Sequence, residues 1–130
     1  MKPSEIEAFL VRYGAALSES RFDELAEAWA IPSLVVSDQG TLAVADRKEV
    51  SDFFARAVKS YHARGVMATR PELLQWEVLS PGLVSVDVAW PGYDERGLEI
   101  KGSREFSRYP LSVSADGKIR ICVAVGRSAH

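Results

Sequence analysis

The stretch SLVVSDQGTLAVADRKEVSDFF, residues 33–54, contains two short strands, the turn between them and the start of a helix. Residues 33–37 and 41–45 are rich in valine and leucine, and the Asp-Gln-Gly sequence between them is typical of a hairpin turn. Asp46 followed by Glu49 forms a capping box, which predicts a helix that Asp46 caps. A β-hairpin joined directly to a helix indicates the α+β class.

The helix after Asp46 has an apolar face that extends well beyond residue 54. Its apolar residues recur at spacings of three and four and are Val50, Phe53, Phe54, Ala57, Val58 and Tyr61. Gly65 marks its end, because glycine favours the left-handed conformation that closes a helix. We expect His62, on the polar side of this helix, to be solvated.

Two further helices are expected before the hairpin. The first begins at a capping box formed by Ser4 and Glu7, and one face of it is apolar: Ile6, Phe9, Leu10, Tyr13 and Leu17. The second spans about residues 21–29, with Ser20 as its cap and Trp29 on its inner face, and Pro32 ends it.

The second half of the chain reads as strands. Residues 72–80 and 83–90 flank a Pro-Gly turn, residues 98–113 form a long strand or a bent pair, and residues 118–125 form the last strand. Three N-terminal helices packed on a curved, mixed or antiparallel sheet follow, as one domain over residues 1–130.

Composition excludes several classes of protein. The formal net charge is −2, so no global attraction to nucleic acid or an anionic membrane is expected. The N-terminus carries charges where a signal peptide needs an apolar run, so we expect a cytoplasmic protein. Cys122, the one cysteine, sits in a strand-like run and is expected to be a small buried hydrophobe.

Four segments carry a resemblance to a known superfamily: residues 12–29, 35–40, 46–54 and 115–125. Together they resemble the NTF2-like superfamily, also called SnoaL-like or ketosteroid isomerase-like, which implies a cone-shaped α+β fold. The N-terminal half is most similar to ketosteroid isomerase. That resemblance implies that Tyr13 is an oxyanion-hole donor and Asp38 the general base.

The second acid of ketosteroid isomerase would fall within residues 103–111, which contain Glu105 but no aspartate. A slip of one residue in this strand exchanges the two faces, so the sequence leaves open whether Ser103, Arg104 or Glu105 faces a pocket.

Each candidate catalytic residue also has a structural interpretation. Asp38 starts a turn in which Gly40 supplies a positive φ, so it is either a turn residue or a carboxylate at a pocket mouth. Tyr13 is either a core aromatic residue or a hydrogen-bond donor to a ligand. Asp87 is either on the outer side of the sheet or an acid facing into the cone.

A pocket in such a cone would be lined mainly by aromatic side chains, which implies an apolar or planar ligand. The expected lining residues are Trp29, Phe54, Tyr61, Trp76 and Trp90, together with Arg104 for an anionic group on the ligand. No residues have the spacing of metal ligands, and the expected chemistry needs neither a metal nor a cofactor.

Three functions remain open from sequence alone. The first is cofactor-independent acid–base chemistry on a small apolar carbonyl compound, as an isomerase, dehydratase or cyclase. The second is non-catalytic binding of a small apolar or aromatic molecule, and the third is homodimeric assembly. We expect a homodimer through the sheet face in each case, because the last strand is apolar on both sides, with Ile119, Ile121, Val123 and Val125 on one and Cys122 and Ala124 on the other.

Overall fold

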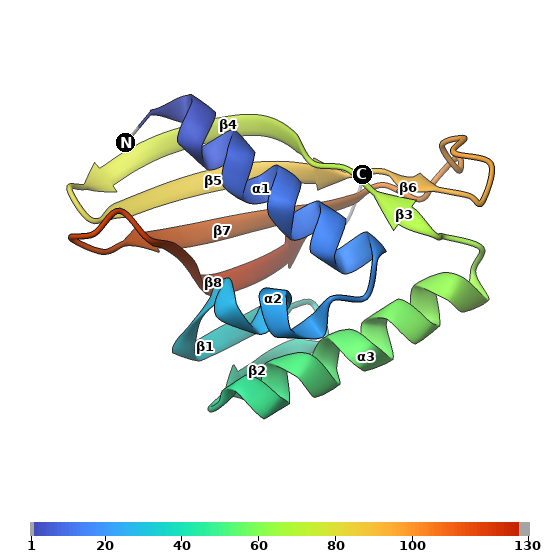
Figure 1. Cartoon of the computed structure of the whole chain (residues 1–130), viewed down its shortest axis with the longest axis horizontal. Coiled ribbons are helices and arrows are strands. Elements are labelled where there is room, and N and C mark those ends of the chain that lie inside the picture. The colour runs from blue at the N-terminus through green and yellow to red at the C-terminus, as the bar shows by residue number, and fades with distance from the viewer. Residues whose placement is uncertain (1, 128–130) are drawn as a thin grey trace.

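The structure is a computed structural model, and it describes residues 2–127. Three helices lie on one face of a curved sheet (Figure 1). The helices are α1 (Pro3–Ser18), α2 (Phe22–Glu27) and α3 (Arg47–Ala63), and the strands are β1 (Trp29–Ser37), β2 (Gly40–Val44), β3 (Ala68–Thr69), β4 (Glu72–Ser80), β5 (Leu83–Trp90), β6 (Gly92–Tyr93), β7 (Glu105–Val113) and β8 (Ile119–Arg127). The α+β class and the helices packed on a mixed sheet are as predicted.

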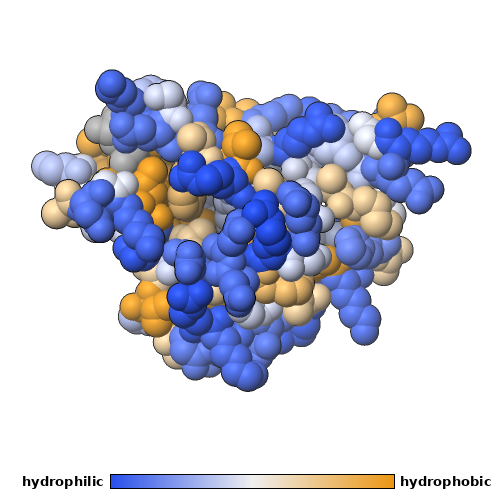
Figure 2. Space-filling view, viewed as in Figure 1, coloured by the Kyte–Doolittle hydropathy of each residue, from blue (hydrophilic) through white to orange (hydrophobic). Residues whose placement is uncertain are grey.

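The main sheet has six strands in the order β2-β1-β8-β7-β5-β4. Strands β1 and β8 are parallel, and the other neighbours are antiparallel. Strands β3 and β6 form a separate two-stranded sheet beside the end of α3 (Figure 1). The helix side of the surface is mostly hydrophilic, with apolar side chains in separate small areas (Figure 2).

Local signals gave the helix α3 and the hairpin β4–β5 correctly. The Asp46 carboxylate accepts a hydrogen bond from the backbone N–H of Glu49 at 2.8 Å, and the Glu49 carboxylate accepts one from Ala45 at 2.7 Å. Strands β4 and β5 have the predicted bounds. The alternating inner residues of β5 are buried: Val84, Val86, Val88 and Trp90.

The predicted caps of the first two helices are wrong. Helix α1 begins at Pro3, one residue before Ser4, and Lys2 occupies the N-cap without a side-chain hydrogen bond. Proline suits the first helical position because its missing N–H would have no partner there. Helix α2 has Arg21 rather than Ser20 at its N-cap, again without a side-chain hydrogen bond.

Trp29 belongs to β1, not to the second helix. It pairs with Ile121 of β8, and the Ala28 carbonyl accepts a hydrogen bond from the Ile121 N–H at 2.7 Å. Pro32 lies inside β1 after a cis peptide bond, at a break in the register between β1 and β8. Pairing with the end of the chain therefore sets where α2 stops, and the sequence around Pro32 does not show that pairing.

The predicted strand over residues 98–113 is too long. Strand β7 begins at Glu105, and residues 94–104 form a loop in which Gly97 and Gly102 have positive φ values of 80° and 78°. The Asp94 carboxylate closes the first turn of the loop by accepting hydrogen bonds from the N–H groups of Arg96 and Leu98.

The two faces of β8 are not those expected from simple alternation. The register between β7 and β8 shifts between Arg108 and Leu111. Ile121 pairs with the inward Leu111, whereas Val125 pairs with Arg108, whose own partner Asp87 lies on the outer face. An irregularity in the pairing moves the side chains beyond it to the opposite face, so Val125 is on the outer face while Ile121 is in the core.

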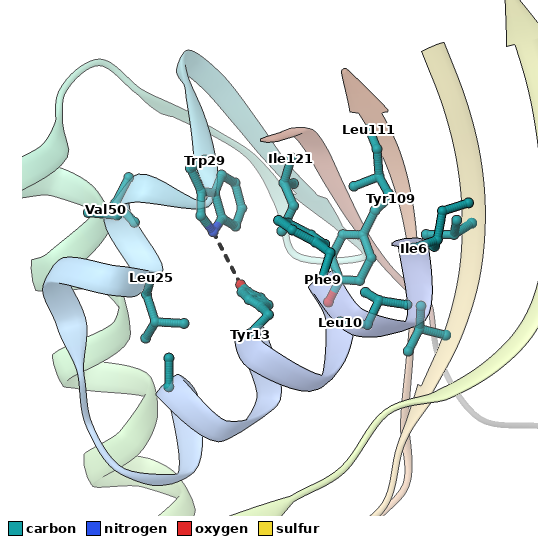
Figure 3. Close-up of a cluster of buried hydrophobic side chains, with 14 of the residues drawn as sticks. Ile6, Phe9, Leu10, Tyr13, Leu25, Trp29, Val50, Tyr109, Leu111 and Ile121 are labelled. Carbon is teal, nitrogen blue, oxygen red and sulfur yellow. Dashed lines mark hydrogen bonds between the residues drawn. The ribbon is translucent and has the colours of Figure 1, made fainter. Parts of the chain in front are cut away.

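The core lies between the helices and the inner face of the sheet (Figure 3). Its fully buried members come from α1, α2, α3 and the inner faces of β5, β7 and β8 and include Ile6, Leu10, Leu25, Val50, Leu111 and Ile121. No helix among residues 2–127 is long and apolar enough to cross a bilayer.

Candidate functional site

A cavity of about 170 Å³ opens between α1, α3 and the inner face of the sheet. Its walls are mainly aromatic and include Tyr13, Trp29, Phe54, Tyr61, Trp90 and Tyr109. Strands β3 and β6 contribute Thr69 and Gly92 to its rim. The cavity therefore offers an apolar interior with a small number of polar groups, which is the usual composition of a small-molecule site.

Two tyrosine–tryptophan pairs place hydroxyl groups in this cavity. The Trp29 indole N–H donates to the Tyr13 hydroxyl oxygen at 3.2 Å (Figure 3), and the Trp90 indole N–H donates to the Tyr109 hydroxyl oxygen at 2.9 Å. The rings of Tyr13 and Tyr109 lie edge to face, with centroids 6.4 Å apart. The two pairs thus converge on one region from α1 and β1 on one side and β5 and β7 on the other.

The hydroxyl groups of Tyr13 and Tyr109 line the cavity in their protonated form. An indole N–H can only donate, so each tyrosine oxygen accepts in its pair and keeps its own proton. A hydrogen bond between the side chains of Ser107 and Tyr109 lowers the pKa of the Tyr109 hydroxyl, but burial raises it by more. Burial raises the pKa of both hydroxyls, so they remain protonated donors at neutral pH.

The mouth of the cavity carries charged groups around Tyr61 of α3. Glu105 of β7 lies beside the Tyr61 hydroxyl, and burial together with this carboxylate raises the tyrosine pKa. The Arg64 guanidinium lies over the Tyr61 ring, 5.1 Å from its centroid. His62 also lines the mouth, although its side chain is exposed as predicted.

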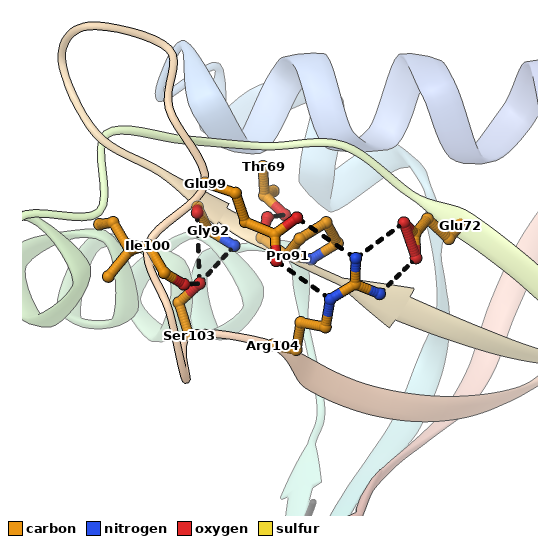
Figure 4. Close-up of polar contacts among 8 residues, drawn as sticks. All are labelled: Thr69, Glu72, Pro91, Gly92, Glu99, Ile100, Ser103 and Arg104. Carbon is orange, nitrogen blue, oxygen red and sulfur yellow. Dashed lines mark hydrogen bonds and ion pairs between the residues drawn. The ribbon is translucent and has the colours of Figure 1, made fainter.

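The structure shows which side chains at the start of β7 face the cavity. Ser103 and Glu105 line it, and Arg104 does not. The Arg104 guanidinium points away and binds Glu72 at 2.6 Å and Glu99 at 3.1 Å (Figure 4). The expectation that Arg104 lines the pocket is therefore corrected, because its two carboxylate partners lie outside the cavity and hold it there.

Ser103 fixes the rim against β6. Its hydroxyl oxygen accepts from the Gly92 N–H at 2.9 Å and donates to the Ile100 carbonyl at 2.5 Å (Figure 4). A Cβ atom at Gly92 would lie 3.0 Å from the Cβ of Ser103 and 3.0 Å from Val66, so a larger residue there would have to displace its neighbours. The rim is therefore rigid on this side.

Two more predicted site residues lie elsewhere. Asp38 is exposed in the turn between β1 and β2 and is not among the residues that line the cavity, so its role as general base stays a prediction. Trp76 is on the edge strand β4, 37% exposed, and is not among the residues that line the cavity. Trp29, Phe54, Tyr61 and Trp90 do line the cavity, and their role in binding stays a prediction.

Sequence reasoning missed Tyr109 and Arg64. Tyr109 is two residues from the buried Leu111, so a strand alternation anchored at Leu111 places both on the inner face. Arg64 follows the end of α3 as its C-cap residue, and nothing in its local sequence distinguishes it from the other exposed arginines.

Comparison with known proteins identifies a family with the fold described above. Residues 4–129 match a family model described as NTF2-like protein (DUF6841). No curated protein matched the chain.

Solved structures with the same fold are remote in sequence. A domain of unknown function with a cystatin-like fold from Nostoc punctiforme is 13% identical, with a TM-score of 0.77 over 100% of this chain and 80% of that chain. An NTF2-like protein from Novosphingobium aromaticivorans is 14% identical, with a TM-score of 0.73 over 95% and 79%. A ketosteroid isomerase-like protein from Erwinia carotovora is 15% identical, with a TM-score of 0.68 over 97% and 96%. Because the family model covers nearly the whole chain, this protein belongs to the NTF2-like family.

Proposed function

We propose that this protein binds a small, mainly apolar molecule, about the size of one aromatic ring, that presents a hydrogen-bond acceptor to Tyr13 and Tyr109. The observation that carries the proposal is the pair of indole N–H groups that occupy the tyrosine oxygens. Because each tyrosine oxygen already accepts from an indole, an acceptor on the ligand such as a carbonyl oxygen would take the hydroxyl proton.

The size of the cavity limits the ligand. Its 170 Å³ is close to the roughly 150 Å³ of an engineered cavity that holds benzene. It is smaller than the roughly 300–1,000 Å³ typical of sites for drug-sized ligands. A single ring with a short substituent therefore fits better than a steroid.

A matched pair of ligands tests the proposal. Acetophenone and ethylbenzene have similar shapes, but only acetophenone carries a carbonyl acceptor. We expect calorimetric titration to show acetophenone binding about tenfold tighter, since a buried donor that loses its partner costs about 1–3 kcal/mol. Tyr109→Phe should remove this preference, and Tyr93→Phe, which changes a tyrosine outside the lining, should keep it. Equal affinity of the two compounds for the unaltered protein would contradict the proposal.

Acid–base catalysis in the same cavity is a second candidate, because Glu105 is the single carboxylate among the described lining residues. Its carboxylate would take a proton from the carbon next to a bound carbonyl. The C–H electron pair would form a C=C bond, and the charge on the oxygen would be held by Tyr13 and Tyr109. The proton then returns to carbon.

Deuterium exchange separates catalysis from binding. If the candidate is right, the methyl protons of acetophenone exchange with D₂O faster in the presence of the protein, by NMR. Glu105→Gln should abolish the acceleration. Asp38→Asn tests the general base that the resemblance to ketosteroid isomerase implies. If exchange is lost in Asp38→Asn and kept in Glu105→Gln, Asp38 is the general base.

A homodimer through the outer face of the sheet remains our proposal for assembly. This face exposes Leu34 and Leu83, at 40% and 41%. Val123 pairs with Leu34 on the neighbouring strand β8. Sedimentation velocity should show a dimer that Val123→Glu dissociates, and a monomeric unaltered protein would refute this. The cytoplasmic location also stays a prediction.

A further inference from the structure

Two opposite charges at the mouth of the cavity contact Tyr61 rather than an ion-pair partner: the Glu105 carboxylate is hydrogen-bonded to its hydroxyl, and the Arg64 guanidinium lies over its ring. Arg64 and Glu105 both line it, and neither forms an ion pair with any residue in the described part of the chain. Arg104, which lies between the lining residues Ser103 and Glu105, is by contrast held outside the cavity by Glu72 and Glu99. The mouth is thus the one part of this site where a cation and a carboxylate are both left for a ligand.

Tyr61 fixes the arrangement of the two charges. The Arg64 guanidinium lies over one face of its ring at 5.1 Å, and Glu105 lies beside its hydroxyl. The guanidinium and the carboxylate therefore contact different parts of the same side chain, the ring face and the hydroxyl. Arg64 also donates through Nε to the Ser60 carbonyl at 3.4 Å, which leaves its two terminal nitrogens for an anion.

We propose that the ligand of this cavity is a zwitterion of the amino-acid class with a single-ring side chain, whose carboxylate binds Arg64 and whose ammonium group binds Glu105. This inference rests on the proposed function, since it needs the ring to occupy the cavity and reach Tyr13 and Tyr109. A guanidinium matches a carboxylate with two parallel hydrogen bonds, and a carboxylate accepts from an ammonium group. A ligand with one charge would leave the opposite charge of the mouth unused.

Four compounds with the same ring separate the contributions: p-cresol with neither charge, tyramine with the ammonium, 3-(4-hydroxyphenyl)propionate with the carboxylate, and L-tyrosine with both. We expect L-tyrosine to bind tightest by calorimetry, with each charge contributing about threefold to tenfold in affinity. Binding of p-cresol reports the cavity alone, so failure of the proposed function and failure of this inference are distinguishable.

Two variants assign the charges. Arg64→Gln should reduce L-tyrosine affinity to that of tyramine, and Glu105→Gln should reduce it to that of the propionate, with p-cresol affinity unchanged in both. Arg56→Gln, on the same helix but outside the lining, is the matched control and should have no effect.

Several outcomes would overturn the inference. If tyramine binds as tightly as L-tyrosine, the site takes a cation and Arg64 has no part in it. If 3-(4-hydroxyphenyl)propionate binds as tightly as L-tyrosine, the site recognises only the carboxylate and Glu105 has no part in binding. If p-cresol binds and no charged compound improves on it, the mouth recognises no charge, and if none of the four binds, the proposed function fails as well.

Discussion

The Trp90 indole N–H is 2.9 Å from the Tyr109 hydroxyl oxygen, and this contact joins β5 to β7 inside the cavity rather than in the sheet. The two residues are on the inner face of neighbouring strands, but they are not direct partners, since Val86 pairs with Tyr109 and Trp90 pairs with Glu105. The tryptophan therefore reaches along the sheet to the tyrosine, and it sets the direction in which the tyrosine can donate.

Removing the Tyr109 hydroxyl should destabilise the fold. Tyr109→Phe leaves the buried Trp90 N–H without an acceptor, which costs about 1–3 kcal/mol. Urea unfolding followed by tryptophan fluorescence measures the loss. Tyr93→Phe, at a half-exposed residue of β6, is the control and should change stability by less than about 0.5 kcal/mol. A loss of that small size in the Tyr109 variant would show that the indole finds another acceptor.

Alkaline pH should destabilise the protein through its buried tyrosines. Burial raises the pKa of Tyr13, Tyr61 and Tyr109 above the value of about 10 in an unfolded chain. The folded state then holds these protons when the unfolded state releases them. The stability is fully present below pH about 10 and is lost as the pH rises through the folded-state pKa values, by about 1.4 kcal/mol per pH unit for each tyrosine.

Urea unfolding at a series of pH values from neutral upward measures this slope. Replacing one of the three tyrosines by phenylalanine should lower the slope by about one third. If Tyr13→Phe, Tyr61→Phe and Tyr109→Phe all keep the slope of the unaltered protein, the loss of stability has another origin.

Gly92→Ala should damage the rim of the cavity. The added Cβ would meet the Ser103 Cβ and Val66 at 3.0 Å, and overpacking of this kind costs about 1–3 kcal/mol. Gly82→Ala is the matched control, since its added Cβ meets the Val113 carbonyl at an ordinary 3.5 Å. Thermal unfolding of the two variants compares them, and an equal shift in both would mean that the rim yields without strain.

Arg104→Gln should loosen the β7 entry more than it lowers global stability. The guanidinium and its partners are exposed by 39–43%, and exposed ion pairs contribute about 0–1 kcal/mol. Because Arg104 lies between Ser103 and Glu105, we expect faster hydrogen exchange at residues 99–106 and unchanged exchange in α1. Arg96→Gln, in the same loop but without an ion pair among the described residues, should leave both segments unchanged.

Features set by neighbouring residues could be predicted from the sequence. The cap formed by Asp46 and Glu49 lies within four residues, and the β4–β5 hairpin needs only its own turn, so both were predicted correctly. The end of α2 and the face of Val125 depend on how β8 pairs with β1 and β7. No local sequence pattern indicates how β8 pairs with these two strands.

In the candidate site too, some positions follow from local sequence and others depend on how distant strands pair. The position of Tyr13 on the inner face follows from helical spacing, and its burial confirms it. The other half of the site, Tyr109 and Glu105, comes from a strand whose start depends on the loop before it. The resemblance to ketosteroid isomerase pointed to Asp38, because the local sequence is similar there even though the turn carries that carboxylate away from the cavity.

Strand β8 comes last of the strands along the chain, yet it lies in the interior of the sheet, between β1 and β7. Without it, the sheet would be divided into β2–β1, which carries Trp29, and β7–β5–β4, which carries Tyr109 and Trp90. During translation, β1 and β7 therefore cannot be joined in one sheet until residues 119–127 have left the exit tunnel of the ribosome. The cavity thus forms in the same event that joins the two parts of the sheet, and a nascent chain stalled before this strand would lack the complete cavity wall.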